Sequence, residues 1–316
     1  MSRARVLVAS DLHGSNACFI KLLNLAVEVS ANAVAIPGDL TGKEAFIGTS
    51  RGGRFEYRDS LGAWKNISLE TFYSLKKQWS DRGIYTRLLE GNINLTDQSY
   101  WEIFSECKIR RLRQWLDYAT EKIGRAGVET FLIPGNDDTE EITPVLEQSI
   151  PGVKSVDGIV CKWGPFPIFG LGYSNETPYL TARELTEEEI GEHLSGLGAE
   201  VKAQGLSMRD AIALIHVPPV GTGLDIAPEV FTHEDGSFEI VPGAQKAVGS
   251  QAVREFILEA QPLCVFSGHC HDGQGVLYLG HTFCVNPGSA YQLGTLKAVL
   301  VVIEDGRVLS YQALMR

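Results

Sequence analysis

The stretch VLVASDLHG, residues 6–14, joins a short apolar run to a polar motif, and the same arrangement recurs at four later points. AVAIP at 33–37 leads into GDLTG, and TFLIP at 130–134 leads into GNDD. AIALI at 211–215 leads into HVPP, and LCVFS at 263–267 leads into GHCH. Short apolar runs of this kind are typical of buried strands. Because open α/β sheets bind ligands at the carboxyl ends of their strands, the five motifs predict one composite site.

The motifs contain seven side chains that bind metal ions well, namely two carboxylates, four imidazoles and one amide. They are Asp11, His13, Asp39, Asn136, His216, His269 and His271. Mixed nitrogen and oxygen donors suit Mn, Fe, Zn, Co or Ni better than Ca or Mg. Seven donors are too many for one tetrahedral ion, and they fit two ions that share a bridging carboxylate. Two divalent ions with two carboxylates keep a net positive charge, which favours an anionic ligand such as phosphate.

Each of these residues also has an ordinary structural interpretation. Asn136 lies in Gly-Asn-Asp-Asp, which is common turn chemistry. His216 precedes two prolines and could lie at the edge of a core, while Asp39 could be a turn residue. The pair His269 and His271 shares one side of an extended stretch, which turn chemistry does not explain. We interpret the residues as ligands because they occur in series.

The series resembles the motifs of the calcineurin-like metallophosphoesterase superfamily, which read D-x-H, G-D, G-N-[H/D/C]-[D/E], H and G-H-x-H. The resemblance spans residues 5–289 and implies an α/β fold in which two sheets pack between outer helices, an αββα sandwich. It implies that a first divalent metal ion binds Asp11, His13, Asp39 and His271. It implies that a second binds Asp39, Asn136, His216 and His269, with Asp39 as the bridge.

At one position the chain departs from the pattern. Many members carry His directly after the Asn, where it is assigned to binding the substrate phosphate or protonating the leaving group, and this chain has Asp137. An ionised carboxylate there would repel phosphate. A protonated Asp137, its pKa raised by burial or by Asp138, could act as a general acid. Another acid, either water or a cap residue, is an open alternative. Asp137 and Asn136 are the candidate catalytic residues.

Two further stretches look like elements of the smaller cytosolic phosphoesterases of this superfamily. One is Asn-Pro-Gly-Ser at 286–289, and the other is the G-x-G-x-S-N-x-T-P pattern at 170–178. Both are weaker signals than the five metal motifs.

The resemblance implies metal-dependent hydrolysis of a phosphate ester by a hydroxide that bridges the two ions. Phosphoprotein phosphatases typically carry V-D-R-G and R-G-N-H-E, whereas this chain has GDLTG and PGNDD. That difference favours a small phosphodiester or nucleotide-type ester as the substrate. The alternatives are a phosphomonoesterase, a nuclease of the same superfamily and a non-catalytic metal-binding scaffold.

Composition limits the partners. The chain has 316 residues, 44% of them hydrophobic, which is enough for a full core. Its net charge of −11 argues against a nucleic-acid or anionic-membrane surface. We expect no membrane span and no signal segment, and the six cysteines contain no C-x-x-C pair, so we expect reduced thiols in the cytoplasm. The expected partner is a small phosphate ester, and the sequence predicts no particular oligomeric state.

The chain reads as a single domain over 1–316, with residues 43–105 inserted as a cap beside the site. Within the insertion we expect a hairpin after Ile47 and helices over 68–80 and 84–90. A basic amphipathic helix over 106–126 then leads back to the core.

Past the third core strand we expect three more helices, over 140–149, 184–204 and 243–260. The second should open with a capping box formed by Thr186 and Glu189. A hairpin turn is expected at Asp235-Gly236.

Overall fold

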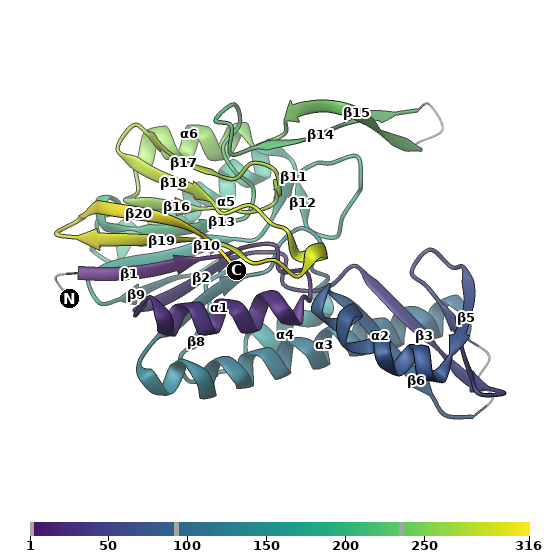
Figure 1. The fold of residues 1–316 in the computed structure, drawn as a ribbon. Helices are drawn as coiled ribbons and strands as arrows, with labels where there is room; N and C mark the ends of the chain where they lie inside the picture. The colour runs from purple at the N-terminus through teal and green to yellow at the C-terminus, as the bar shows by residue number, and fades with distance from the viewer. Residues whose placement is uncertain (1–2, 92–94, 234–236) are drawn as a thin grey trace.

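The protein, described by a computed structural model over residues 3–91, 95–233 and 237–316, contains two six-stranded sheets (Figure 1). Helices cover the outer face of each sheet, so the layers follow the order helix, sheet, sheet, helix. The expected αββα sandwich is confirmed. Within the described ranges, no helix combines the length and apolarity that crossing a membrane requires.

The first sheet has the strand order β20-β19-β1-β2-β7-β8. The bounds are β20 (Arg307–Met315), β19 (Lys297–Glu304), β1 (Arg3–Val8), β2 (Ala33–Pro37), β7 (Glu129–Ile133) and β8 (Val153–Ser155). Strands β1, β2, β7 and β8 run parallel to one another, so three motif-bearing strands end at the same edge. Strands β19 and β20 form a C-terminal hairpin and add the antiparallel part.

The second sheet has the order β17-β18-β16-β13-β10-β9. The bounds are β17 (Gly275–Leu279), β18 (Thr282–Asn286), β16 (Cys264–Phe266), β13 (Ile212–Ile215), β10 (Phe166–Leu171) and β9 (Val160–Trp163). Strands β10, β13, β16 and β18 are parallel, so the motifs after β13 and β16 also share an edge.

Alternation along β1 shows how the layers form. Val6 and Val8 face the second sheet and pack into the core between the sheets, whereas Leu7 packs against the outer helices. The helices over the first sheet are α1 (Asn16–Glu28), α3 (Asp97–Lys122) and α4 (Thr143–Leu146). Those over the second sheet are α5 (Glu187–Ala203) and α6 (Gln251–Ala260).

Residues 44–89, here called the inserted unit, form a separate four-stranded sheet with one helix. Its elements are β3 (Glu44–Arg51), β4 (Arg54–Arg58), β5 (Trp64–Ser68), α2 (Leu69–Asp81) and β6 (Ile84–Leu89). The predicted hairpin is β3–β4, whose turn residues Gly52 and Gly53 both have positive φ. The inserted unit projects from the sandwich beyond the end toward which β1 runs (Figure 1). That it caps a substrate stays a prediction.

Three of the expected helices differ in the structure. Residues 84–90 form the strand β6, because they pair in parallel with β3 and bury Tyr85. Residues 140–149 form only a 3-10 turn (Glu140–Ile142) and the four-residue α4, and Pro144, which has no N–H to donate back to Glu140, prevents one continuous helix through both. The helix over 97–122 starts nine residues before the expected position 106.

The prediction for the stretch after β13 was also partly wrong. Strand β14 (Ile226–Thr232) pairs with β15 (Phe238–Ala247), so the helix expected from 243 begins only at Gln251, where Ser250 caps it. The expected turn residues Asp235-Gly236 lie outside the described residues. The capping box of Thr186 and Glu189 at α5 is confirmed. The smallest sheet pairs β11 (Ser174–Asn175) with β12 (Glu184–Leu185).

Candidate metal centre

The loops that follow β1 and β2 run side by side. The Asp11 amide donates to the Gly38 carbonyl oxygen at 3.1 Å, and the His13 amide donates to the Asp39 carbonyl oxygen at 2.9 Å. A Cβ on Gly38 would lie 2.0 Å from His216 Nδ1, so only glycine permits His216 to approach this loop. The ends of β1, β2 and β13 therefore deliver two carboxylates and two imidazoles to one place.

Four of the candidate ligands have a strained backbone. Asp11, His13, Asp39 and His269 have φ values of 54°, 41°, 52° and 63°, in the left-handed region that non-glycine residues rarely adopt. Such strain persists only where the surrounding structure imposes it, and it concentrates at functional sites. The chain here turns sharply at each strand end, which points the side chains into the shared space.

The first group of donors surrounds His13. Its Nε2 lies 3.1 Å from His271 Nε2 and 3.4 Å from Asp39 Oδ2. His271 Nε2 also lies 3.7 Å from Asp11 Oδ1. The ligand atoms of Asp11, His13 and His271 all fall within 4.8 Å of one another. This is the set that the family resemblance assigns to the first ion, completed by Asp39, and its role as a metal site stays a prediction.

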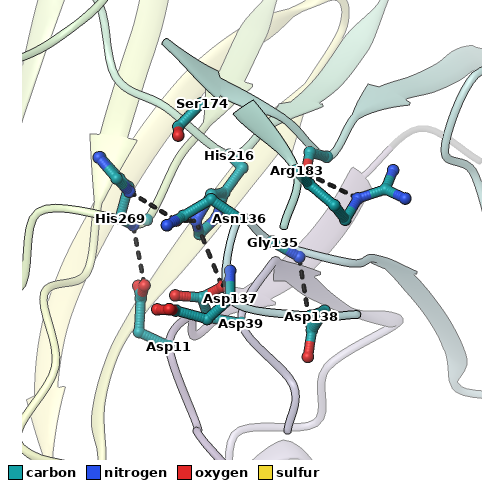
Figure 2. Close-up of polar contacts among 12 residues, drawn as sticks. Asp11, Asp39, Gly135, Asn136, Asp137, Asp138, Ser174, Arg183, His216 and His269 are labelled. Atoms are coloured by element: carbon teal, nitrogen blue, oxygen red, sulfur yellow. Dashed lines mark hydrogen bonds and ion pairs between the residues drawn. The ribbon is translucent and has the colours of Figure 1, made fainter. Parts of the chain in front are cut away.

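The second group surrounds the Asn136 amide oxygen. His216 Nε2 lies 2.9 Å and His269 Nδ1 lies 2.8 Å from Asn136 Oδ1. In Figure 2 Asn136, His216 and His269 lie above the side chains of Asp11 and Asp39. The backbone amide of His269 also donates to Asp11 Oδ1 at 2.9 Å.

Asp39 lies between the two groups. Its Oδ2 faces His13 Nε2 at 3.4 Å and its Oδ1 faces His216 Nε2 at 3.6 Å. A Cβ on Gly135 would lie 2.1 Å from Asp39 Oδ1, so the loop after β7 also closes tightly on this carboxylate. One carboxylate with an oxygen toward each group has the arrangement that a bridging ligand needs. Its role as the bridge stays a prediction.

The hydrogen bonding of these residues fits a bound cation. His216 Nδ1 lies 2.8 Å from the Pro37 carbonyl oxygen, which can only accept, so Nδ1 carries the proton. In a neutral ring Nε2 then presents a lone pair to Asn136 Oδ1, which is itself an acceptor. Asp11 Oδ2 and His13 Nδ1 are buried without a hydrogen-bond partner. Facing lone pairs and an unpaired buried carboxylate oxygen are costly unless a cation is shared between them.

Burial sets the protonation of the donors. It lowers the pKa of His13 well below the ordinary value and lowers the pKa of His269 to about 3, so both rings are neutral at pH 7, the form in which imidazole can bind a metal ion. Burial, then the charges of Asp137 and Asp11, raise the pKa of Asp39 well above its ordinary value. Burial also acts to raise the pKa of Asp11, but the hydrogen bond and charge of His271 outweigh it and lower the pKa to about 2. Buried Asp and His side chains of this kind can hold metal ions.

Asp137 has partners that the sequence did not indicate. Its backbone amide donates to Asp39 Oδ1 at 3.1 Å, and its Oδ2 forms an ion pair with Lys43 Nζ at 2.5 Å. Burial raises its pKa, but the charge of Lys43 outweighs burial and the net pKa is lowered. The geometry therefore favours the carboxylate over the protonated acid considered from the sequence. Lys43 had one sequence signal, its place directly after GDLTG.

Asp138 holds two loops of the site together, a role that the sequence did not indicate. It is fully buried and accepts from the Leu40 amide at 2.8 Å, the Thr41 amide at 2.9 Å and the Thr41 hydroxyl at 2.6 Å. Its Oδ2 also accepts from the Gly135 amide at 2.9 Å (Figure 2). One carboxylate thus ties the Asp39 loop to the Asn136 loop.

The Asn-Pro-Gly-Ser stretch ties the two sheets together at the site. The buried Asn286 amide donates to the carbonyl oxygens of Gly268 at 3.1 Å and Cys270 at 2.9 Å. The Ser289 hydroxyl donates to the Asp11 carbonyl oxygen at 2.7 Å. These bonds hold the His269–His271 loop beside the loop of Asp11.

A short relay orients the Asn136 amide. The Thr181 hydroxyl donates to Glu184 Oε1 at 2.5 Å, so its oxygen must accept from Asn136 Nδ2, which lies 2.8 Å away. With the amide nitrogen held by Thr181, the amide oxygen faces His216 and His269. The relay therefore selects the orientation in which Asn136 offers oxygen to a metal ion.

We expect Thr181→Val to weaken Mn²⁺ affinity by roughly 10–100-fold, because losing an outer-shell partner frees the ligand to rotate. Isothermal titration of metal-free protein with Mn²⁺ measures it. Thr177→Val is the matched control, since the Thr177 hydroxyl also donates to Glu184, at 2.5 Å, whereas the Asn136 amide donates to Thr181. Equal affinities for both variants and the parent would show that the relay does not matter.

Comparison with known proteins gives a relative by sequence. No known family model matches the chain. The uncharacterized protein MJ1162 of Methanocaldococcus jannaschii is 30% identical over 181 residues, which are 56% of this chain and 72% of the archaeal protein.

Solved structures share the fold. The protein TT1561 of Thermus thermophilus aligns with a TM-score of 0.53 at 17% identity, over 95% of this chain and 98% of that one. A dimetal phosphatase from Danio rerio aligns with a TM-score of 0.48 at 10% identity, over 99% of this chain and 98% of the other. The chain shares the fold of TT1561, its motif series resembles that of the calcineurin-like metallophosphoesterases, and it belongs to the same family as MJ1162.

Proposed function

We propose that this protein hydrolyses phosphate esters with the help of two divalent metal ions, and that its substrate is a small phosphodiester or nucleotide-type ester. The observation that carries the proposal is the position of Asp39, whose two oxygens face two separate groups of donors. Asp11, His13 and His271 would complete the site of one ion, and Asn136, His216 and His269 that of the other. Mn, Fe, Zn, Co and Ni all suit these ligands.

Two such ions, when bound, polarise a phosphoryl group and lower the pKa of bound water to about 7. The chain's own residues contribute position and charge. The tautomer of His216 is fixed by the Pro37 carbonyl, and the orientation of Asn136 is fixed by Thr181. Asp138 holds two of the motif loops together, so the donor atoms are arranged before substrate binds.

The charge at the site supports a diester. Asp137 is ionised and paired with Lys43, so the pair adds no net positive charge. A monoester carries a second negative charge near neutral pH, and the charge of Lys43 is already balanced by Asp137, whereas a diester brings only a single charge. The overall charge of −11 supports a small substrate over a nucleic acid. The six cysteines are all buried free thiols, which supports a cytoplasmic location.

The test is hydrolysis of bis(p-nitrophenyl) phosphate and p-nitrophenyl phosphate by metal-free protein supplied with Mn²⁺, and again after chelation. Metal content per chain is measured on the same sample, and Ca²⁺ serves as the control ion because it prefers all-oxygen sites. We expect two Mn²⁺ per chain, diester turnover that chelation removes, and little turnover with Ca²⁺. A preference for the monoester would show that the substrate is a phosphomonoester and not a phosphodiester. Two bound ions without turnover on either ester would favour a non-catalytic scaffold.

A further inference from the structure

Lys43 follows a backbone segment that is held from two sides. The amide and hydroxyl of Thr41 donate to Asp138 at 2.9 and 2.6 Å, and the Gly42 amide donates to the Tyr85 hydroxyl at 2.9 Å. A Cβ on Gly42 would lie 2.2 Å from the Gly83 carbonyl oxygen, so this position needs glycine for the close approach. The Lys43 side chain therefore starts from a fixed point where the core meets the inserted unit.

The Lys43 ammonium lies at the edge of the candidate metal centre. It pairs with Asp137 Oδ2 at 2.5 Å, and the Asp137 amide bonds Asp39 Oδ1, so one residue separates the ammonium from the proposed bridge. The charge of Lys43 also acts on His13 and Tyr291, and the Tyr291 ring centroid lies 4.4 Å from that of His13. Lys43, Tyr291 and the metal-site histidines thus surround the same space.

The ammonium keeps capacity for another ligand. Its side chain is 45% exposed, whereas that of Asp137 is 18% exposed. A lysine ammonium has three donors, and its contact with Asp137 is the only hydrogen bond or ion pair found for it among the described residues, so donors remain for an incoming anion. Asp137, as an ionised carboxylate, can only accept hydrogen bonds and cannot bind a phosphoryl oxygen itself.

We propose that Lys43 binds a phosphoryl oxygen of the substrate directly, as the cationic part of the phosphate subsite, while Asp137 positions it. This rests on the proposed function, because it assigns a contact to the same site. The competing interpretation is that Lys43 only cancels the charge of Asp137. The two interpretations predict different phosphate affinities for a variant that lacks both the Lys43 charge and the Asp137 charge.

The experiment measures binding of inorganic phosphate to Mn²⁺-loaded protein by isothermal titration, in the parent, Lys43→Met and Lys43→Met/Asp137→Asn. We expect Lys43→Met to weaken phosphate binding by about tenfold or more, the scale of one charge-assisted hydrogen bond. Direct contact predicts that the double variant stays as weak as the single one. Recovery of parental affinity in the double variant would overturn the proposal, as would unchanged affinity in Lys43→Met.

Three controls keep the result specific. Lys77→Met removes an 86% exposed lysine of the inserted unit and should leave phosphate affinity unchanged. Lys43→Arg should retain binding, and Lys43→Gln replaces Lys43→Met if the latter does not fold. Manganese content must stay at the parental value in every variant.

Failure of this proposal differs from failure of the proposed function. If the parent hydrolyses diesters and Lys43→Met keeps the parental KM and phosphate affinity, only the Lys43 assignment is wrong. Suppose instead that the parent hydrolyses neither ester, and that Lys43→Met and the double variant both bind phosphate more weakly than the parent. Then only the proposed function is wrong. A parent that binds no phosphate would overturn the Lys43 assignment.

Discussion

The Asp39→Asn variant should lose phosphodiester hydrolysis by on the order of a thousandfold or more, because metal ions supply several kcal/mol of transition-state stabilisation. Asp39 directs one oxygen toward His13 and the other toward His216, so one substitution weakens both groups of donors. An amide keeps the shape but presents one neutral oxygen in place of a shared negative charge. We expect Mn²⁺ content to fall below two ions per chain.

The same variant should fold normally without metal. Burial and the neighbouring charges of Asp137 and Asp11 disfavour the Asp39 carboxylate, so a neutral amide removes an unfavourable term. Thermal unfolding in chelator should therefore give a midpoint no lower than that of the parent. Asp59→Asn, at a buried aspartate of the inserted unit that pairs with Lys65, is the control and should keep its metal content. Full activity in Asp39→Asn would exclude Asp39 as a bridging ligand.

The Asp138→Ala variant should lower the free energy of unfolding by roughly 3–5 kcal/mol, among the largest single effects. Its carboxylate satisfies three backbone amides and one hydroxyl in a site with no exposure. Alanine leaves these donors buried without partners, and each unsatisfied donor costs about 1–3 kcal/mol before water relieves part of it. Urea unfolding followed by circular dichroism measures the change.

Asp117→Ala on the exposed face of α3 is the control for Asp138→Ala. It should shift the free energy of unfolding by no more than about 0.5 kcal/mol, as substitutions at exposed sites usually do. If Asp138→Ala also changed stability this little, the two loops would be held together by other contacts, and the bracing role of Asp138 would be wrong.

The αββα sandwich and the convergence of the donors could be predicted because they depend on local pattern. Buried strands are short apolar runs, and polar residues at their carboxyl ends meet at one edge of a sheet. The structure places Asp11, Asp39 and His216 together as the motif order implied. Their service as metal ligands stays a prediction.

The residues that the sequence did not indicate are those whose role depends on tertiary contacts. Asp138 reads as an ordinary turn residue, and its bonds reach back nearly a hundred positions to Leu40 and Thr41. The pairing of Lys43 with Asp137 likewise joins distant segments. Residues 84–90 were expected to be helical from their local sequence. They form the strand β6 because pairing with β3, which buries Tyr85, outweighs local propensity.

Helix α3 belongs to two hydrophobic cores at once. Its first turns place Tyr100 and Phe104 in a core with Ala45 and Ile47 of the inserted unit, whereas Leu112 and later residues pack on the first sheet. A chimaera that exchanges only residues 44–89 between relatives would leave half of this helix facing a foreign surface. The transplantable module therefore extends to about Cys107, in the middle of an uninterrupted helix, and the inserted unit cannot be exchanged by swapping residues 44–89 alone.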